Sequence, residues 1–149
     1  MTEPKEMSTA ASGEMTDLRL IELADRAREA SYSPYSCFSV GAALLCADGR
    51  VYTGANIEVS SYTPTICAER VAIFKAVNDG VRDFTAIAIS GGPHGDVTYS
   101  CSPCGVCRQV MAEFCSPDFR IILKTEDGCA AYTLADLLPL AFGKGDLKK

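Results

Sequence analysis

The sequence predicts a layered α/β fold with a central mixed sheet of about five strands. Apolar residues recur at helical spacing in several segments, and short apolar runs suited to strands alternate with them. Near the start, two such runs are joined by an Asp-Gly turn, which is typical of an antiparallel hairpin. Each face of a sheet in such a chain needs apolar cover, so the helices are expected to pack against it.

The first half of the chain is predicted to hold one helix and the hairpin. Leu and Ala residues recur at helical spacing from Asp17 to Tyr32, with Thr16 or Asp17 as the N-cap. The apolar run 38–46 predicts a strand, Asp48-Gly49 predicts a turn, and 50–54 is the returning strand. These two strands are therefore expected to pair antiparallel.

The second half is predicted to alternate between helices and strands. In chain order it holds a helix over 64–78, a strand over 84–90, a helix over 105–115 and a strand over 119–124. Asp127-Gly128 then turns the chain into a short strand over 129–132, and Thr133 caps a last short helix.

Length and composition indicate one globular domain. The 149 residues suffice for a full core, and 48% apolar with 22% charged residues is ordinary for globular proteins. We expect a disordered tail over 1–15, a single catalytic domain over 16–143 and a polar C-terminal tail over 144–149. The sequence shows neither the apolar segment of a secretory signal nor a run of about 18 apolar residues that could cross a membrane.

Charge and cysteine content narrow the partners and the compartment. A net charge of −5 and a pI near 4.8 disfavour a nucleic acid polymer, because phosphate backbones are bound largely by Lys and Arg. The expected partner is a small molecule, and no membrane partner is expected. Eight cysteines in a chain of this size indicate reduced thiols and metal ligands in a cytoplasmic protein rather than a disulfide framework.

Two cysteine motifs supply the residues for one zinc site. Cys67-Ala68-Glu69 is followed later by Pro103-Cys104-Gly105-Val106-Cys107. Three cysteines suit Zn²⁺ with one open coordination position, whereas a closed structural site uses four protein ligands. Glu69 follows the first cysteine by two residues and is placed to move protons at the site, so the combination favours a hydrolytic zinc enzyme. The alternative is a buried Cys67, a solvated Glu69 and a redox or structural pair of cysteines.

Both motifs are predicted to lie at helix N-termini. Cys67 falls in the first turn of the helix over 64–78, and Cys104 and Cys107 open the helix over 105–115. Helix N-termini carry partial positive charge and free N–H groups, which favour thiolates over thiols. Two helix starts that face one metal ion would form a ligand cradle.

Two further residues leave alternatives open. Cys101 precedes the cysteine pair by the same spacing, so it offers another choice of ligand, and a Cys₄ site would be closed and inactive. The Pro-Cys-x-x-Cys placement favours Cys104 and Cys107 instead. His94, the single histidine, offers a fourth ligand or a base, but its glycine-rich surroundings favour a turn residue.

From about Leu18 to Phe142, the sequence resembles the small, homotetrameric, zinc-dependent cytidine deaminases. The resemblance rests on five ordered segments: YSCFSVGAAL at 35–44, NIE at 56–58, CAER at 67–70, PCGVCRQ at 103–109 and LLPLAF at 137–142. It implies a layered α/β/α fold and the hydrolytic deamination of cytidine and deoxycytidine to uridine and deoxyuridine in pyrimidine salvage. It also implies a homotetramer with one Zn²⁺ per subunit.

The resemblance assigns roles around the metal. Cys67, Cys104 and Cys107 would bind zinc, and Glu69 would carry protons from the attacking water to the pyrimidine N3 and to the departing ammonia. Three thiolates leave one Zn²⁺ with a net negative charge, which weakens its Lewis acidity. Arg70 would offset that charge; the alternative from the residues alone is a solvated helix arginine.

The resemblance also implies contacts to the substrate and between subunits. The substrate-binding residues would be Phe38 on the base or ribose, Asn56 and Glu58 on the sugar hydroxyls, and the backbone at Ala68 on the ring. Tyr62 and Phe142 would be contributed to each site by a neighbouring subunit. From the residues alone, Phe38 could belong to the core, Asn56 to a turn, and Phe142 could pack on its own subunit.

Two other functions fit parts of the sequence. One is a related deaminase that acts on a nucleoside-like antibiotic or a modified base. The other is a non-catalytic zinc-binding interaction module, which would need four protein ligands and would not need Glu69.

Overall fold

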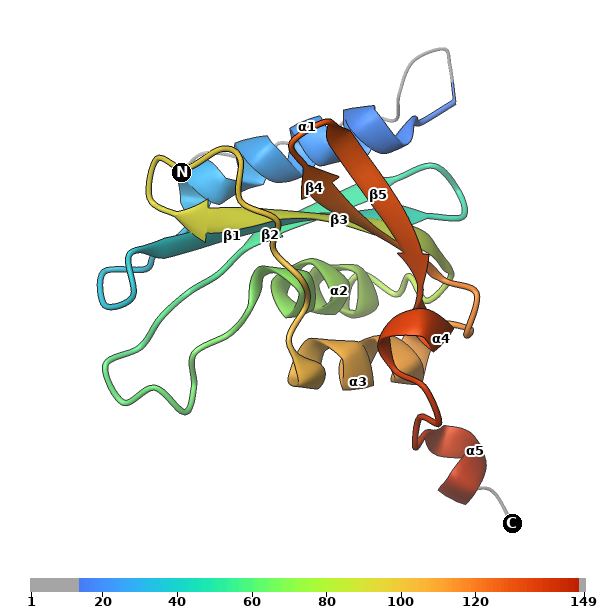
Figure 1. Cartoon of the computed structure of the whole chain (residues 1–149). Coiled ribbons are helices and arrows are strands. Elements are labelled where there is room, and N and C mark those ends of the chain that lie inside the picture. The colour runs from blue at the N-terminus through green and yellow to red at the C-terminus, as the bar shows by residue number, and fades with distance from the viewer. Residues whose placement is uncertain (1–13, 148–149) are drawn as a thin grey trace.

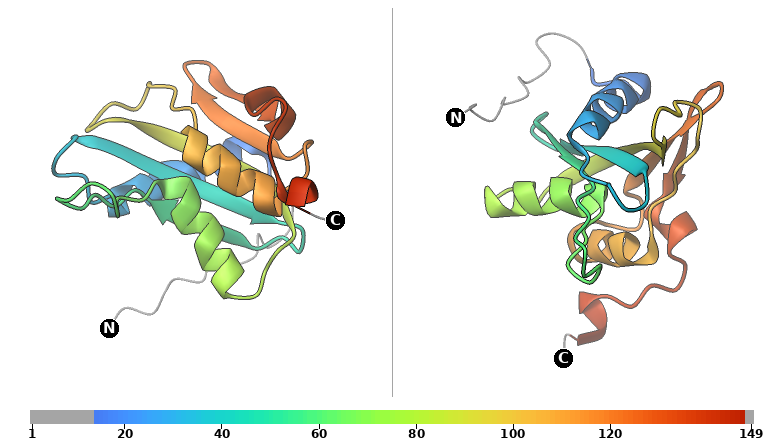
Figure 2. Two further views of the ribbon diagram at one scale, coloured as in Figure 1. Left: turned by 90° about the horizontal axis from the view of Figure 1, so that it is seen from below. Right: turned by 90° about the vertical axis from the view of Figure 1, so that its left-hand side faces the viewer.

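The computed structural model describes residues 14–147, so residues 1–13 and 148–149 of the predicted tails lie outside the described residues. Within this range, α1 covers one face of a five-stranded sheet, and α2 and α3 cover the other (Figure 1, Figure 2). The predicted α/β/α layering is therefore confirmed. In chain order the elements are α1 (Asp17–Ala27), η1 (Arg28–Ala30), β1 (Phe38–Cys46), β2 (Val51–Ala55), α2 (Ala68–Asn78), β3 (Phe84–Pro93), α3 (Gly105–Phe114), β4 (Arg120–Thr125), β5 (Gly128–Thr133), α4 (Leu134–Leu137) and α5 (Lys144–Leu147).

The sheet is mixed, as the sequence predicts. Its strand order is β2-β1-β3-β4-β5. β1 pairs antiparallel with β2 and β3, and β5 pairs antiparallel with β4. β3 and β4 run parallel, because the chain crosses from one to the other through α3. The loop before α3, which carries the second cysteine motif, therefore leaves the sheet at the carboxyl end of β3.

Strands β1 and β3 are buried on both faces, and their alternate residues serve two separate cores. Leu44 and Ile87 belong to the core that also contains Ile73 of α2 and Met111 of α3. Their neighbours in the strands belong to the opposite core, which contains Leu20 of α1. Because successive side chains of a strand point to opposite faces, one apolar strand holds helices on both sides of the sheet.

Two glycines let helices approach the sheet closely. A Cβ at Gly41 would collide with the carbonyl oxygen of Ala24 in α1. A Cβ at Gly54 would lie 2.5 Å from the carbonyl oxygen of Ala68 and 2.6 Å from the nitrogen of Ala72, both in α2. Since Ala68 opens α2, the missing side chain at Gly54 sets how closely this helix N-terminus packs on β2.

The first helix ends earlier than predicted. Thr16 is its N-cap and accepts a hydrogen bond from the Arg19 nitrogen at 3.1 Å, but α1 stops at Ala27 and a single 3₁₀ turn follows. Tyr32, predicted as the last helical residue, is extended instead. Its nitrogen donates to the Asn56 oxygen at 3.0 Å, and its oxygen accepts from the Glu58 nitrogen at 2.8 Å. This non-local pairing replaces the last predicted helical turn.

The second helix begins later than predicted. Residues 64–66 were expected to be helical, but Ile66 pairs with Ile57 through two backbone hydrogen bonds of 3.0 Å each, and the helix begins at Ala68. β3 is longer than predicted, because β1 pairs with it as far as Pro93. The predicted cap at Thr133 is present as a capping box with Asp136. The four-residue α5 lies within the segment predicted as a polar tail.

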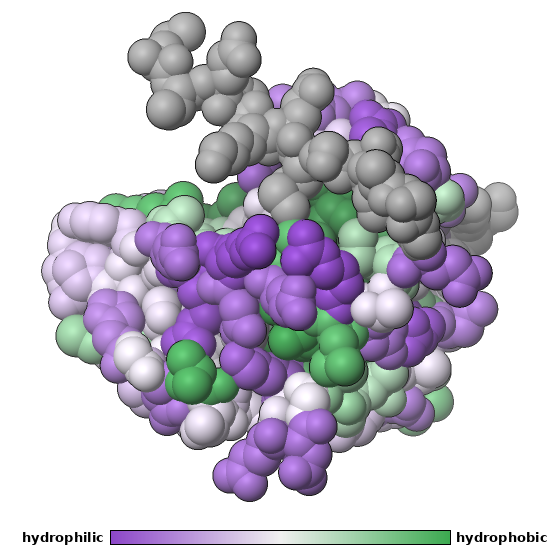
Figure 3. Space-filling view, turned by 90° about the horizontal axis from the view of Figure 1, so that it is seen from above, coloured by the Kyte–Doolittle hydropathy of each residue, from purple (hydrophilic) through white to green (hydrophobic). Residues whose placement is uncertain are grey.

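The outer face of α1 is polar. Seen from the α1 side, many hydrophilic side chains gather on this face of the molecule (Figure 3). Arg19, Glu22, Arg26 and Glu29 are exposed along α1 and η1, opposite the apolar stripe that faces the sheet. Among the described residues, no helix combines the length and the apolar character needed to cross a membrane.

Candidate active site

Three cysteine sulfurs lie together at the N-termini of α2 and α3. The Sγ atom of Cys104 lies 3.6 Å from that of Cys67 and 3.5 Å from that of Cys107, and all three sulfurs lie within 4.8 Å of one another. Zn–S bonds of about 2.3 Å in a tetrahedron separate two sulfurs by about 3.8 Å. The spacing and the soft donors therefore fit Zn²⁺, with a fourth position left for a non-protein ligand.

Backbone pairing and close packing hold the two helix starts in place. Cys67 is the N-cap of α2, not a first-turn residue as predicted, because the Ile57–Ile66 pairing keeps the chain extended until that point. Cys104 is the N-cap of α3, and Cys107 lies in its first turn. Both helix N-termini thus direct their partial positive charge toward the sulfur cluster, as expected from the sequence.

Cys101 and His94 lie outside this cluster. Among the described residues, the candidate metal group consists of Cys67, Cys104 and Cys107. Burial raises the pKa of Cys101 to about 12, and the negative charge of Glu69 acts in the same direction. The Nε2 atom of His94 instead lies 2.9 Å from the Ser33 hydroxyl. The closed Cys₄ arrangement considered from the sequence is therefore not formed.

Two of the sulfurs, those of Cys67 and Cys107, differ in how readily they ionise. A hydrogen bond from the Cys107 thiol lowers the pKa of Cys67 to about 5, and the Arg70 guanidinium assists against the effect of burial. The same hydrogen bond raises the pKa of Cys107, because its proton is held by the Cys67 thiolate. Because zinc is bound by thiolates, metal binding at this cluster would displace thiol protons.

Glu69 is a buried carboxyl group beside the cluster. It is the second residue of α2 and its residue surface is 3% exposed. Burial, followed by the negative charge of Cys67, raises its pKa to about 7, while a hydrogen bond with Cys107 acts in the opposite direction. A carboxyl group with this pKa exchanges protons near neutral pH.

Arg70 places a positive charge against the sulfurs. Its Nη2 atom donates to the Cys67 Sγ at 3.5 Å, and its Nε is buried without an acceptor among the described residues. Burial alone would lower the pKa of Arg70, but hydrogen bonds to Cys67 and Cys107 raise it overall. Arg70 is thus directed at the cluster rather than solvated.

Asn56 and Glu58 are both buried and held by the segment that enters β1. The Asn56 Oδ1 accepts from the Val40 nitrogen at 2.9 Å, and its Nδ2 donates to the Phe38 oxygen at 2.8 Å. The Glu58 carboxylate accepts from the nitrogens of Tyr35 and Ser36 at 3.0 and 3.1 Å. A further bond from the Ser36 hydroxyl is the main cause of the lowered pKa of Glu58.

The ring of Phe38 is partly buried and meets the ring of Tyr99 edge-on, with centroids 5.4 Å apart. Ala68 is fully buried at the start of α2. The pairing of Ile57 with Ile66 brings the segment with Asn56 and Glu58 next to the residue that precedes Cys67. The sugar-binding candidates and the first ligand thus belong to adjacent backbone segments.

Tyr62 and Phe142 are exposed, by 66% and 59% respectively. Tyr62 lies in a left-handed conformation with φ of 59°, and the Phe142 oxygen accepts a 2.7 Å hydrogen bond from Gln109 of α3. Phe142 therefore does not pack into the core of its own subunit, which was the alternative considered from the sequence.

The comparisons with known proteins agree on one family. Residues 14–123 match the family model described as the cytidine and deoxycytidylate deaminase zinc-binding region. A cytidine deaminase of Sporosarcina psychrophila is 52% identical over 87% of this chain and 93% of its own length, and one of Halalkalibacterium halodurans is 50% identical over 86% and 95%. The crystal structure of a cytidine deaminase from Burkholderia pseudomallei, 46% identical, superposes with a TM-score of 0.78 over 86% of this chain and 100% of that one.

The chain belongs to the cytidine and deoxycytidylate deaminase family. It is a zinc-dependent hydrolytic deaminase, and its three-cysteine cluster is compatible with one Zn²⁺ per subunit. The predicted family, fold, enzyme class and cofactor are confirmed.

Some contacts within the deaminase were not predicted. The Ser36 hydroxyl donates to the Glu58 carboxylate and accepts from the Phe38 nitrogen. The ring of Tyr99, from a loop far along the chain, packs on the ring of Phe38. Ser36 lies inside the matched segment 35–44, so the sequence contained a weak signal for it. No spacing pattern marks Tyr99, because its partner is set by the course of the loop after β3.

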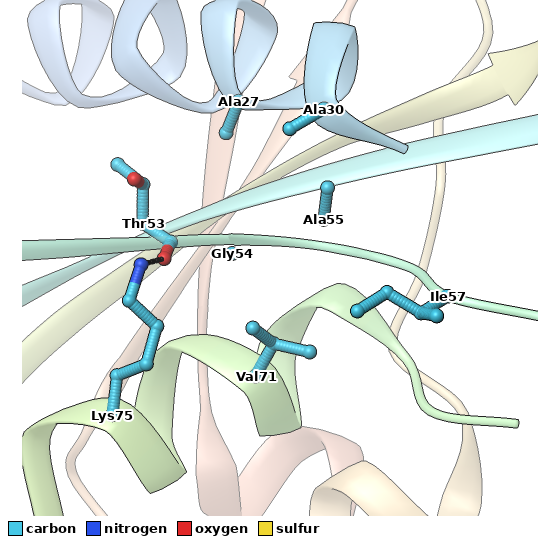
Figure 4. A pocket seen from close by; sticks show the side chains of 8 residues that line it. All are labelled: Ala27, Ala30, Thr53, Gly54, Ala55, Ile57, Val71 and Lys75. Carbon is cyan, nitrogen blue, oxygen red and sulfur yellow. Dashed lines mark hydrogen bonds between the residues drawn. The ribbon is translucent and has the colours of Figure 1, made fainter. Parts of the chain in front are cut away.

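A separate cavity lies on the β2 side of the deaminase. Its volume is about 190 Å³, and Ala27, Gly54, Val71 and Lys75 are among the residues that line it (Figure 4). The Lys75 ammonium donates to the Thr53 oxygen at 2.5 Å, and burial lowers the pKa of Lys75. No predicted site residue lines this cavity.

Proposed function

We propose that the enzyme hydrolyses cytidine and deoxycytidine to uridine and deoxyuridine, with release of ammonia. The observation that carries this proposal is a buried carboxyl group, Glu69, beside three sulfurs that leave one zinc position open. A non-catalytic zinc module would instead close the site with a fourth protein ligand. Relatives named cytidine deaminases support the choice of nucleoside.

The chemistry divides between the metal and the chain. Cys67, Cys104 and Cys107 would hold Zn²⁺, which supplies Lewis-acid activation of the attacking water when bound. Glu69 takes the proton that the water loses and gives it to the pyrimidine N3. The water oxygen meanwhile bonds to C4 of the pyrimidine. The proton of the new C4 hydroxyl then passes through Glu69 to the amino group, so that the C4–N bond breaks, a C4=O bond forms and ammonia leaves. Its pKa of about 7 suits both directions of transfer.

Asn56 and Glu58 recognise the sugar. The Asn56 Oδ1 accepts two hydrogen bonds, from the Val40 nitrogen and from the Ser31 hydroxyl, so both its lone pairs are used. One of the two N–H groups of Nδ2 donates to the Phe38 backbone oxygen. Asn56 therefore has a donor to offer the substrate, whereas the Glu58 carboxylate is an acceptor. One sugar hydroxyl satisfies both, because it donates to Glu58 and accepts from Asn56. Phe38 packs on the base or the ribose, and the backbone at Ala68 holds the ring.

The function is tested by assaying protein of measured zinc content with cytidine and with deoxycytidine. Turnover of both is expected, because the sugar pair engages one hydroxyl. A chelator should abolish activity, and added Zn²⁺ should restore it, because the bound metal is the Lewis acid that activates the water. Zinc-loaded protein that turned over a nucleoside-like antibiotic or a modified base, but neither nucleoside, would contradict the proposed substrate.

Arg70→Gln is expected to lower the catalytic rate more than it weakens zinc binding. The guanidinium offsets the negative charge of the thiolates, so its loss leaves a more electron-rich metal that acidifies water less. We expect a rate loss of about 10- to 100-fold and a pH–rate profile moved to higher pH. Lys75→Gln, in the same helix but lining the separate cavity, is the control. A rate and pH profile equal to those of the wild type would return Arg70 to a surface role.

The active enzyme is a closed homo-oligomer, a D₂ tetramer, in which Tyr62 and Phe142 complete a neighbour's site. Their exposure supports this arrangement, as does the fully exposed Leu140 beside Phe142. Eight free cysteines within the described chain support a reducing cytoplasm, where the enzyme would act in pyrimidine salvage.

Mixed oligomers test the shared site. Phe142→Ala and Glu69→Ala subunits, each inactive alone, should regain activity when they are refolded together, because some sites combine an intact Glu69 with a neighbour's intact Phe142. Mass measurement verifies the mixing, and refolding each variant with itself is the control. Mixed oligomers without activity would contradict the shared site, as would an active Phe142→Ala enzyme.

A further inference from the structure

A chain of side-chain hydrogen bonds leads from the single histidine to the Asn56 amide. The Ser31 hydroxyl donates to the Asn56 Oδ1 at 2.5 Å. The hydroxyls of Ser31 and Ser33 lie 2.9 Å apart, and the Ser33 hydroxyl lies 2.9 Å from the His94 Nε2. Ser33 is 3% exposed and Asn56 is 9% exposed, and Ser31 between them is partly buried.

The donor and acceptor in each hydrogen bond of this series follow from the orientation of the Asn56 amide. The Val40 nitrogen requires an acceptor and the Phe38 oxygen requires a donor, so the Asn56 amide has one possible orientation. Its Oδ1 cannot donate, so Ser31 must. Each serine hydroxyl has one proton, so Ser33 donates to Ser31 and accepts from His94. The Nε2 atom of His94 therefore carries a proton, in the neutral ring or in the imidazolium.

The outer end of the chain is fixed by the backbone. The His94 nitrogen donates to the Cys37 oxygen at 2.9 Å, which joins the loop after β3 to the loop before β1 at the same end of the sheet (Figure 1). Arg28 holds the same loop through a 2.8 Å bond to the Asp96 oxygen. His94 is therefore held beside Ser33 although it is an exposed residue.

We propose that His94, acting through Ser33 and Ser31, is a positioning residue for the Asn56 amide that reads the nucleoside sugar. The inference rests on the proposed function, because it takes Asn56 as a sugar-binding residue. The chain fills the second lone pair of Oδ1, so Asn56 can meet a sugar hydroxyl with a donor alone. Hydrogen bonds in series also polarise one another, which strengthens the Nδ2 donor.

Kinetics with two substrates test this role. His94→Leu and Ser33→Ala should each raise KM for cytidine by about three- to tenfold, with little change in kcat, because one hydrogen bond in a series is lost. His94→Gln, which keeps a donor, should remain close to the wild type. With 2′,3′-dideoxycytidine, which lacks the hydroxyl that Asn56 would read, the variants should match the wild type.

Two variants separate the hydrogen-bond series from the direct effect of His94 on Glu58. His94 also lies near Glu58, where its charge adds to the lowering of that pKa, but Ser33→Ala leaves His94 in place. In the double variant Ser33→Ala/His94→Leu, KM should rise no further than in the single variants, because both break one chain. Thermal melting verifies folding of Ser33→Ala, and the exposed position of His94 keeps His94→Leu usable if Ser33→Ala is unstable.

The kinetic results distinguish a positioning role of His94 from a general structural role. Equal KM values for wild type and His94→Leu, in an enzyme that deaminates cytidine, would overturn the positioning role and leave the proposed function intact. Equal losses on cytidine and dideoxycytidine would also overturn it, because they would reveal a general structural role. Failure of the zinc-loaded wild type to deaminate either nucleoside would overturn the proposed function, and this inference with it.

Discussion

Replacing Glu69 by alanine is expected to abolish turnover while zinc stays bound and the fold stays intact. Glu69 is buried beside the three sulfurs but stands outside the group of metal-ligating atoms, so its proposed task is proton transfer. Groups that act as general acids or bases contribute about 10²- to 10⁴-fold to rate. Because Glu69 would serve several transfers in one turnover, we expect a loss at the upper end of this range or beyond it.

The measurement combines activity, zinc content and thermal melting on the same preparation. Glu113→Ala, an exposed glutamate of α3, is the matched control and should behave as the wild type. Loss of zinc from Glu69→Ala would make this residue a ligand and overturn its assignment as the proton carrier. Retained activity would require another group to move the protons.

Substitution of a proposed ligand is expected to remove the metal and much of the stability. Cys104→Ala and Cys107→Ala should each lose zinc, because two thiols cannot hold Zn²⁺ as three do. Through the metal, these two cysteines at the start of α3 would be joined to Cys67 at the N-terminus of α2, so their loss should also lower the melting temperature. Removing zinc from the wild type with a chelator should lower its melting temperature in the same direction.

Cys101→Ala is the matched control for the ligand assignment. It precedes Cys104 by the same spacing that separates Cys104 from Cys107, but it lies outside the cluster. It should therefore keep zinc and activity, and its stability should change only by the cost of a small cavity, of roughly 1 kcal/mol. Zinc retained in Cys104→Ala and lost in Cys101→Ala would reverse the choice of ligands.

Much of the fold and of the candidate site follows from local patterns in the sequence. The hairpin follows from two apolar runs around Asp48-Gly49, since this turn type needs a residue that tolerates positive φ, and Gly49 has φ of 91°. The metal ligands follow from short spacings, because residues three apart at a helix start lie on one side. Cys104 and Cys107 are such a pair.

Boundaries that depend on distant partners could not be predicted. The helix expected to reach Tyr32 ends at Ala27, and the helix expected from Pro64 begins at Ala68. In both cases one residue of the lost segment, Tyr32 or Ile66, pairs with Ile57, which lies beyond the four-residue reach of helical hydrogen bonds. Local propensity favours a helix there, but hydrogen bonds to another segment decide the conformation.

Local sequence patterns are enough to specify the alternation of helices and strands, the apolar faces that form the two cores, and the set of residues able to bind zinc. These properties depend on residue type and spacing, which are local. Three other features appear only in the folded molecule: Cys101 stays outside the cluster, Arg70 is directed at Cys67, and His94 reaches Asn56 through two serines. These relations depend on how β1, β3 and α2 are brought together, because hydrogen bonds and charges act over a few ångströms regardless of distance along the chain.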